Sequence, residues 1–258
     1  MNFLEKIRPK IERRVSFESE RFPLVEIKKA LNSLTPPRDW MGAFSKGRTA
    51  LIAEVKRSSP STGVLKAEYR PEELARLYER AGAAAMSVLT EGSFFGGEPE
   101  HLAQVKAACQ LPVLRKDFII EPYQVYQSRL LGADAVLLIA EMLEPDRLRE
   151  MLDFCRELGM GCLVEAHDQP ALEKAVKSGA KTIGINNRNL ATLKVDLEAG
   201  LRLLPLIPED RIKVSESGIS TREQIIELEA AGADAFLVGG AILKAEDPAA
   251  KIKELLGR

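Results

Sequence analysis

The sequence predicts a (β/α)8 TIM barrel with an N-terminal helical extension, chiefly because one short phrase recurs along the chain. The phrase places a glycine before an aliphatic run: AGAAAMSVL at 81–89, LGADAVLLI at 131–139, SGAKTIGI at 178–185 and AGADAFLVG at 231–239. Successive intervals of 50, 47 and 53 residues separate its glycines, Gly82, Gly132, Gly179 and Gly232. Each interval fits two strand–helix units of about 25 residues, as in a barrel of parallel strands.

The first 47 residues precede this pattern. They carry helical patterns around 2–15 and 23–34, followed by SLTPPRDW at 33–40. We interpret them as an extension of one domain, 1–258, whose barrel occupies 48–258. A lid, a plug for one end of the barrel and a dimer contact are all compatible with this extension.

The other strands and the helices fall between the glycine phrases. The strands are LIAEVK at 51–56, PVLRKD at 112–117, GCLVEA at 161–166 and RIKVSES at 211–217. PEELARLYERAG at 71–82 and EPDRLREMLDFCRELG at 144–159 have apolar residues at helical spacing, the first with Pro in its first turn. Each phrase glycine suits the left-handed end of a helix, and the aliphatic run after it suits a strand covered on both faces.

Composition excludes several classes of function. The 37 basic and 38 acidic residues give a net charge of -1, which argues against nucleic-acid or membrane-surface binding that depends on excess positive charge. The longest apolar stretch, AFLVGGAIL at 235–243, is too short to span a bilayer, and the N-terminus resembles no signal peptide, so we expect a cytoplasmic protein. Three cysteines without a CxxC pair and two histidines predict no metal site.

Polar residues fall where the predicted strands end. Glu54 and Lys56 lie two positions apart and therefore point to the same face of the first strand. Further strands end at Lys116, Glu165, Asn186, Glu216 and Ser217. In a barrel of this kind the carboxyl ends of the strands build the active site, where interleaved Lys and Glu tune each other's proton affinities. Solvated loop charges or a structural salt-bridge network are the plainer alternatives.

Two glycine-containing loops predict a phosphate site. SESGIS at 215–220 follows the seventh strand and LVGGAI at 237–242 follows the eighth, the usual place for phosphate in these barrels. Glycines in such loops let backbone N–H groups approach the anion. The alternative is that these glycines only make tight turns.

Two aromatic residues lie in loops near the same predicted end of the barrel. Phe95 follows the second strand and Phe118 the third. They suit the wall of a pocket for a flat apolar group, or they anchor their loops by packing.

These segments together resemble the indole-3-glycerol phosphate synthase family, lyases of tryptophan biosynthesis. The motifs that carry the resemblance are LIAEVKRSSPSTGVL, SVLTEGSFFGG, LPVLRKDFII, LVEAHD, IGINNRNL and VSESGI, in this order from about residue 50 to 245. The resemblance implies a cofactor-free ring closure of 1-(2-carboxyphenylamino)-1-deoxyribulose 5-phosphate, with loss of carbon dioxide and water.

The resemblance also implies roles for the charged residues. Lys116 would protonate the carbonyl oxygen during closure, and Glu165 would position that lysine or accept a proton. Glu54 and Lys56 would serve acid–base steps in the dehydration and neutralise substrate anions. Which carboxylate is the base stays open.

Substrate contacts follow from the same resemblance. Asn186 and Arg188 would orient hydroxyls and the carboxylate, and Ser59 would lie near the anionic groups. Phe95 and Phe118 would line the anthranilate pocket, and Ser217, Gly218, Gly239 and Gly240 would hold phosphate, Gly240 through its backbone alone. Two strand-end residues complete the expected substrate contacts, Glu216 and Leu237.

Two rival functions are considered. Phosphoribosylanthranilate isomerase would be expected to use a Cys and Asp pair at strand ends, and neither residue occupies such a place here. A non-catalytic barrel that binds a phosphorylated ligand is the other. The expected partner is a small molecule, with no nucleic acid, membrane or cofactor, and the expected state is a monomer that is free to associate with other tryptophan-pathway enzymes.

Overall fold

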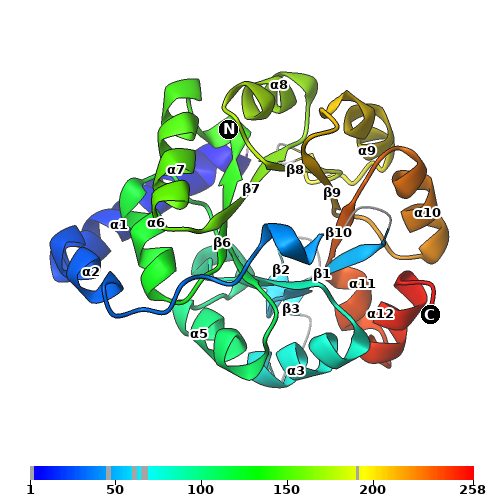
Figure 1. The fold of residues 1–258 in the computed structure, drawn as a ribbon, viewed down its shortest axis with the longest axis horizontal. Helices are drawn as coiled ribbons and strands as arrows, with labels where there is room; N and C mark the ends of the chain where they lie inside the picture. Colours follow the sequence, from blue (N-terminus) through cyan, green and yellow to red (C-terminus); the bar gives the residue numbers. More distant parts are fainter. Residues whose placement is uncertain (1–2, 45–47, 60–62, 65–68, 190–191) are drawn as a thin grey trace.

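The computed structural model describes residues 3–44, 48–59, 63–64, 69–189 and 192–258. Its centre is a closed barrel in which eight parallel strands lie in the order β1-β10-β9-β8-β7-β6-β5-β4, and β4 pairs with β1 (Figure 1). The strands are β1 (Ala50–Val55), β4 (Ala85–Leu89), β5 (Val113–Lys116), β6 (Ala135–Ile139), β7 (Gly161–Ala166), β8 (Thr182–Asn186), β9 (Ile212–Glu216) and β10 (Ala235–Val238). The predicted barrel and all its predicted strands are confirmed.

Helices surround the barrel and connect successive strands (Figure 1). They are α3 (Pro71–Ala81), α4 (Gly92–Phe95), α5 (Pro99–Ala108), α6 (Pro122–Leu130), α7 (Pro145–Glu157), α8 (Gln169–Lys177), α9 (Glu198–Leu203), α10 (Arg222–Ala230), α11 (Gly240–Lys244) and α12 (Pro248–Leu255). Short 3-10 turns are η1 (Met41–Ala43), η2 (Ala140–Met142) and η3 (Leu204–Leu206), and β2 (Ser58–Ser59) pairs antiparallel with β3 (Gly63–Val64).

The four phrase glycines adopt the left-handed conformation that their positions predict. Gly82, Gly132, Gly179 and Gly232 have φ between 88° and 102°. A residue with a Cβ is strained in this region, so glycine lets each helix stop and the chain turn into the next strand. The repeated phrase in the sequence therefore corresponds to a repeated connection from a helix to the next strand.

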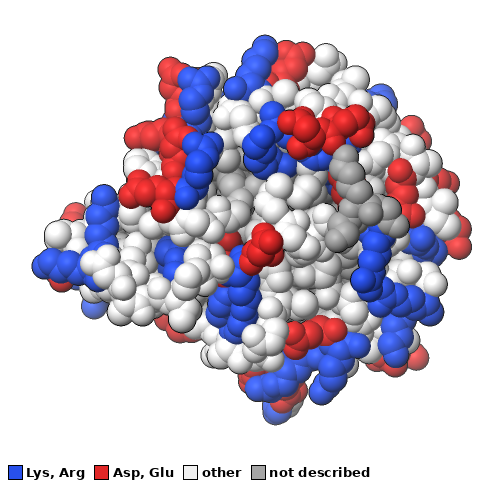
Figure 2. Space-filling view, in the orientation of Figure 1, with Lys and Arg blue, Asp and Glu red and all other residues white. Residues whose placement is uncertain are grey.

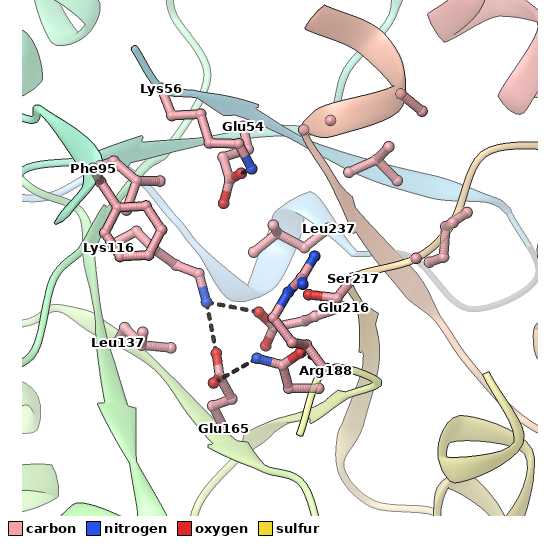
Figure 3. Close-up of a pocket in the computed structure, with 18 of the residues that line it drawn as sticks. Glu54, Lys56, Phe95, Lys116, Leu137, Glu165, Arg188, Glu216, Ser217 and Leu237 are labelled. Atoms are coloured by element: carbon pink, nitrogen blue, oxygen red, sulfur yellow. Dashed lines mark hydrogen bonds and ion pairs between the residues drawn. The ribbon is translucent and has the colours of Figure 1, made fainter. Parts of the chain in front are cut away.

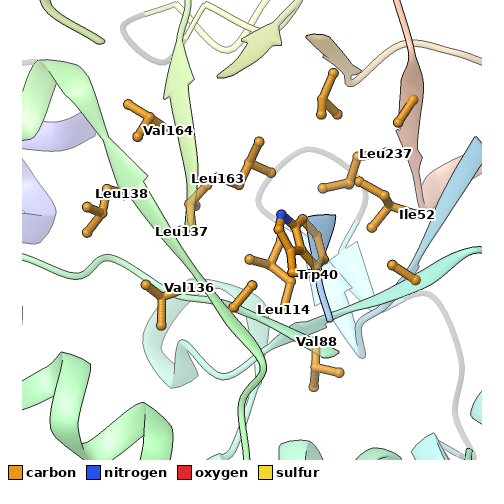
Figure 4. Packing of buried hydrophobic residues seen from close by; sticks show 14 of the residues in the cluster. Trp40, Ile52, Val88, Leu114, Val136, Leu137, Leu138, Leu163, Val164 and Leu237 are labelled. Atoms are coloured by element: carbon orange, nitrogen blue, oxygen red, sulfur yellow. The ribbon is translucent and has the colours of Figure 1, made fainter. Parts of the chain in front are cut away.

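The alternation of side chains along each strand separates the barrel interior from its outer layer. Leu137 lines the interior cavity, whereas its neighbours Val136 and Leu138 point toward the surrounding helices (Figure 4). The core is aliphatic, and these strand residues are all buried. Because the period is two, an apolar interior residue lies two positions before several of the polar strand ends, such as Ile52 before Glu54 and Leu163 before Glu165.

The N-terminal extension has two helices, α1 (Phe3–Arg21) and α2 (Leu24–Leu31). The segment after α2 crosses one end of the barrel (Figure 1). There Trp40, 2% exposed, packs against the Gly161 backbone so closely that a Cβ at this glycine would overlap the indole side chain. Gly161 begins β7, so the segment closes the amino-terminal end of the barrel (Figure 4). Of the three expected roles, this segment acts as a plug.

Charges of both signs are mixed over the surface. Figure 2 shows basic and acidic side chains interspersed around the rim of the molecule, with mostly uncharged residues and some acidic atoms over the middle of the face in view. This distribution agrees with the net charge of -1. None of the helices among the described residues is long and apolar enough to cross a membrane.

Candidate active site

A cavity of about 380 Å³ lies at the carboxyl ends of the strands, within the range that holds small molecules. Around it lie all the site residues expected from the sequence except Ser59: Glu54, Lys56, Phe95, Lys116, Phe118, Glu165, Asn186, Arg188, Glu216, Ser217, Gly218, Leu237, Gly239 and Gly240. Ser59 belongs to β2, and its side chain lies outside the described part of the structure.

The centre of the cavity is an ammonium group held between two carboxylates (Figure 3). Lys116 Nζ lies 2.6 Å from Glu165 Oε2 and 2.8 Å from Glu216 Oε2. Asn186 Nδ2 donates a hydrogen bond of 2.8 Å to Glu165 Oε1. Four different strands contribute these side chains, because each places its last interior residue at the same rim.

The three charged groups of this cluster differ in proton affinity. Burial opposes the charge on Lys116, but Glu165 and Glu216 outweigh it and raise the pKa of the ammonium above its ordinary value. Burial also opposes charge on Glu165, yet Lys116 lowers the pKa of that carboxyl. For Glu216, burial together with the Glu165 carboxylate prevails over Lys116 and raises the pKa to about 8.

Glu216 owes its position to a glycine on the neighbouring strand. A Cβ at Gly184 of β8 would overlap the Glu216 Oε1 atom, so only a glycine leaves room for this carboxyl. That oxygen has no hydrogen-bond partner among the described residues. An unpartnered buried oxygen favours the protonated form of a carboxyl, which agrees with the raised pKa.

A second ion pair lies at the end of β1. Glu54 is 6% exposed, and its carboxylate accepts a short hydrogen bond from the Lys56 ammonium. A Cβ at Gly239 would overlap the Glu54 carboxylate. Gly239 therefore leaves space for the acidic side chain, in addition to any part it has in binding phosphate.

The loop after β9 has an unusual backbone. Ser217 and Gly218 follow each other with φ of 67° and 83°, and Ser217 is one of two described residues other than glycine with a positive φ. Asn187, 1% exposed, donates hydrogen bonds to the Ser217 carbonyl at 3.0 Å and to Ser215 Oγ at 3.1 Å. Asn187 thus fixes a strained loop at the cavity, a role that its place beside Asn186 in the sequence did not suggest.

The apolar wall of the cavity consists of aromatic side chains from three segments. Phe118 lies 6.4 Å from Phe95 and 5.9 Å from Phe3 of α1, ring centre to ring centre. Glu91 accepts hydrogen bonds from three backbone amides of the turn that carries Phe95. Phe3 was not expected from the sequence, because nothing in a terminal helix indicates which residue reaches a distant loop.

A buried ionic cluster attaches α1 to the strand that carries Lys116. Asp117 Oδ1 lies 2.9 Å from Arg14 of α1, and Asp117 Oδ2 lies 2.9 Å from Arg115 of β5. Thr90 donates to the same carboxylate at 2.8 Å. Burial opposes its charge, but Arg115 and Arg14 hold the pKa of Asp117 below its ordinary value. The extension is therefore fixed at both ends of the barrel, as a plug and as part of the cavity wall.

The expected alternative of a purely structural salt-bridge network does not describe this arrangement fully. The ion pairs are real, but they surround an open cavity instead of filling it. Arg188 also lines the cavity, and one of its guanidinium nitrogens donates to the Leu193 carbonyl at 2.9 Å. No group of His, Cys, Asp and Glu side chains suited to hold a metal ion occurs in the described ranges.

Comparisons with known proteins agree with this arrangement. Residues 4–255 match the family model described as indole-3-glycerol phosphate synthase. A protein of that name from Dehalococcoides mccartyi (strain CBDB1) is 49% identical over 252 residues and covers 96% of each chain. One from Aromatoleum aromaticum (strain DSM 19018 / LMG 30748 / EbN1) is 43% identical over 260 residues and covers 99% of each chain.

A solved structure supports the fold alone. The crystal structure of 3-hexulose-6-phosphate synthase superimposes with a TM-score of 0.64 at 18% sequence identity, and the match covers 81% of this chain and 98% of the other. At that identity the likeness indicates a shared barrel, and the chemistry has to be argued from the side chains in the cavity.

Proposed function

The chain belongs to the indole-3-glycerol phosphate synthase family, and from this we propose how the residues of its cavity carry out the reaction. That reaction is the decarboxylating and dehydrating ring closure of 1-(2-carboxyphenylamino)-1-deoxyribulose 5-phosphate to indole-3-glycerol phosphate in tryptophan biosynthesis. The observation that carries the proposal is the Lys116 ammonium, held at hydrogen-bonding distance from Glu165 and Glu216 inside the cavity.

The cavity suits the parts of this substrate. Phe95 and Phe118 offer an apolar wall for the anthranilate ring, with Leu237 on the neighbouring part of the lining. Ser217, Gly218, Gly239 and Gly240 lie on the loops after β9 and β10 and would hold the phosphate. Asn186 and Arg188 would orient the hydroxyls and the carboxylate.

Lys116 acts as the general acid in the first step. The aromatic carbon that bears the carboxylate attacks the ketone carbon, and negative charge develops on the carbonyl oxygen. An ammonium whose pKa is raised keeps its proton while the substrate is a ketone, and it gives the proton up when the oxygen becomes strongly basic. Glu165 and Glu216 hold the ammonium in place, so no solvent reorganisation is needed at that moment.

The later steps use the remaining groups. The bond to the carboxylate breaks, carbon dioxide leaves, and the electron pair restores the aromatic ring. The hydroxyl then leaves as water with a proton from an acid, while a base removes a proton to form the double bond of the five-membered ring. We assign the Glu54 and Lys56 pair to this dehydration, because the two groups already share a hydrogen bond within the same cavity.

The replacement of Lys116 by Ala tests the proposal. We expect loss of indoleglycerol phosphate formation by at least about 10²-fold, since one positioned acid contributes about 10²- to 10⁴-fold. The fold should persist, because Glu216 already favours the protonated state and can keep a proton when the ammonium is gone. Formation of product is followed by absorbance or fluorescence without added metal, and circular dichroism follows the fold.

A matched control is Lys177→Ala. Lys177 is largely exposed on α8 and pairs only loosely with Glu173 at 3.6 Å, so its loss should leave turnover unchanged. A kcat like that of the unmodified enzyme in Lys116→Ala would refute the assignment of Lys116.

We further propose that the enzyme is a single domain that works as a monomer in the cytoplasm. The described lining residues already supply the general acid, a second ion pair and the apolar wall that the reaction uses. Light scattering at assay concentrations checks this, and a dimer that dissociates with loss of activity would contradict it.

A further inference from the structure

We propose that Lys244, at the end of α11, binds the phosphate group of the substrate and supplies the positive charge that the glycine-rich loops lack. The inference rests on the proposed function and extends it by one residue. Lys244 was not among the residues expected from the sequence. Lys244 is an exposed residue and lines the cavity.

The other cations of the cavity are already engaged by the protein. Lys116 lies between Glu165 and Glu216, and Lys56 pairs with Glu54. The Arg188 guanidinium donates to the Leu193 carbonyl. Lys244, by contrast, forms no ion pair or hydrogen bond with any described residue. Among the described lining residues, it is the cation that a ligand meets without first breaking a contact.

Its position on α11 brings Lys244 beside the expected phosphate loops. Residues three and four apart lie on one side of a helix, so Lys244 shares a side with Ala241 and Gly240. All three line the cavity, as does the Ser217–Ser220 segment of the loop after β9. A Cβ at Gly240 would meet no atom within 4 Å, so the space in front of that backbone is open to a ligand.

The charges of the cavity and of the substrate favour an additional cation at the phosphate site. A phosphate carries about −1.5 to −2 charges at pH 7, and the substrate has a carboxylate as well. Glu54, Glu165 and Glu216 would repel these groups wherever their own partners do not neutralise them. Serine and glycine hydrogen-bond donors orient a phosphate but bring no net charge, whereas a lysine ammonium does.

Binding of two small probes tests the proposal without any turnover. In Lys244→Met, inorganic phosphate should bind about tenfold more weakly by calorimetry, the loss typical of one charged contact. Anthranilate, which has no phosphate, should bind unchanged. Lys244→Arg should retain most of the phosphate affinity. The control Lys253→Met, on the exposed side of α12 and outside the cavity, should behave as the unmodified protein.

Steady-state kinetics give a second readout. A contact made equally in the ground state and the transition state affects KM and leaves kcat alone. Lys244→Met should therefore raise KM about tenfold with kcat within about twofold, and it should weaken the dependence of kcat/KM on salt.

The outcomes separate the two proposals. Phosphate affinity in Lys244→Met equal to that in Lys253→Met would show that Lys244 is a solvated surface residue, and equal losses for phosphate and anthranilate would show a structural defect; either result overturns the inference. If phosphate binding depends on Lys244 but no indoleglycerol phosphate forms, the inference stands and the proposed catalytic assignment fails.

Discussion

The pKa values of two glutamates in the same cavity are shifted in opposite directions. The immediate neighbours of each carboxyl explain the difference. Glu165 accepts hydrogen bonds from both Lys116 and Asn186, so its charge is stabilised on both oxygens. Glu216 shares the same ammonium, but its second oxygen faces Gly184 and has no partner among the described residues. One carboxyl is therefore kept ionised while the other tends to hold a proton.

Glu216→Gln should change the pH dependence of the enzyme. The pKa of Glu216 is raised to about 8, so kcat/KM of the unmodified enzyme should bend near that pH as the free cluster loses its proton. Glutamine cannot titrate, and the bend should disappear from a profile measured between pH 6 and 9.

Stability should follow the same group. A carboxyl whose pKa is raised in the folded state contributes stability that is complete below its unfolded pKa and is lost as the pH rises through about 8. The free energy of unfolding of Glu216→Gln should fall less than that of the parent over this range in urea titrations. If the free energy of unfolding had the same pH dependence in the two proteins, a group other than Glu216 would be responsible for that dependence.

The charged residues of the cavity and their protonation states were predictable from the sequence only in part. The period of two in a strand, together with the common direction of barrel strands, is enough to place Glu54, Lys116 and Glu165 at one rim. It says nothing of which carboxyl loses its proton, because that depends on the partner of each oxygen. Asn187 shows the same limit, since its contact with the Ser217 backbone is made across two loops.

Helix α1 shows what an element adds to a site that lies far from it in sequence. The eight barrel strands were predictable because their pattern is local and repeated. The contacts of α1 were not, because a charged residue on a terminal helix resembles any solvated residue until its partner is known. Arg14 forms an ion pair with Asp117, next to Lys116, and Phe3 completes the aromatic wall of the cavity.

Arg14→Met should loosen this attachment. Asp117 keeps Arg115 and Thr90 as partners, so we expect a loss of about 1–2 kcal/mol in the free energy of unfolding, less than for a buried charge left alone. KM should rise, because Phe3 is held less firmly at the cavity, while kcat changes little. Thermal unfolding and steady-state kinetics measure both effects.

Arg13→Met is the matched control on the same helix. Arg13 is exposed and, among the described residues, donates to the Pro9 carbonyl of its own helix at 3.2 Å, so both parameters should stay unchanged. An equal rise of KM in the two variants would show that α1 responds to its total charge and not to the contact with Asp117.

For the molecule as a whole, the plug at the amino-terminal end joins the extension to the barrel core. The sequence left its role open among three possibilities, because a tryptophan after two prolines has no local signature of where it packs. The fit of Trp40 against Gly161 and the ring of Phe44, 4.9 Å away, gives the answer.

Trp40→Ala should therefore destabilise the whole protein. Truncation of a buried Trp typically costs about 3–5 kcal/mol, and we expect that loss in denaturant unfolding, with little change in kcat because the site lies at the opposite end. Phe17→Ala, on the exposed side of α1, serves as the control and should cost less than about 0.5 kcal/mol. A loss in Trp40→Ala as small as that of the control would mean that the indole is dispensable.

The closed amino-terminal end has a consequence for how small molecules enter and leave the enzyme. Because Trp40 and the segment around it close the amino-terminal end, we expect carbon dioxide to leave through the opening at the carboxyl ends of the strands, where the substrate also enters. Carbon dioxide therefore leaves before the product, because decarboxylation precedes the dehydration that completes the ring.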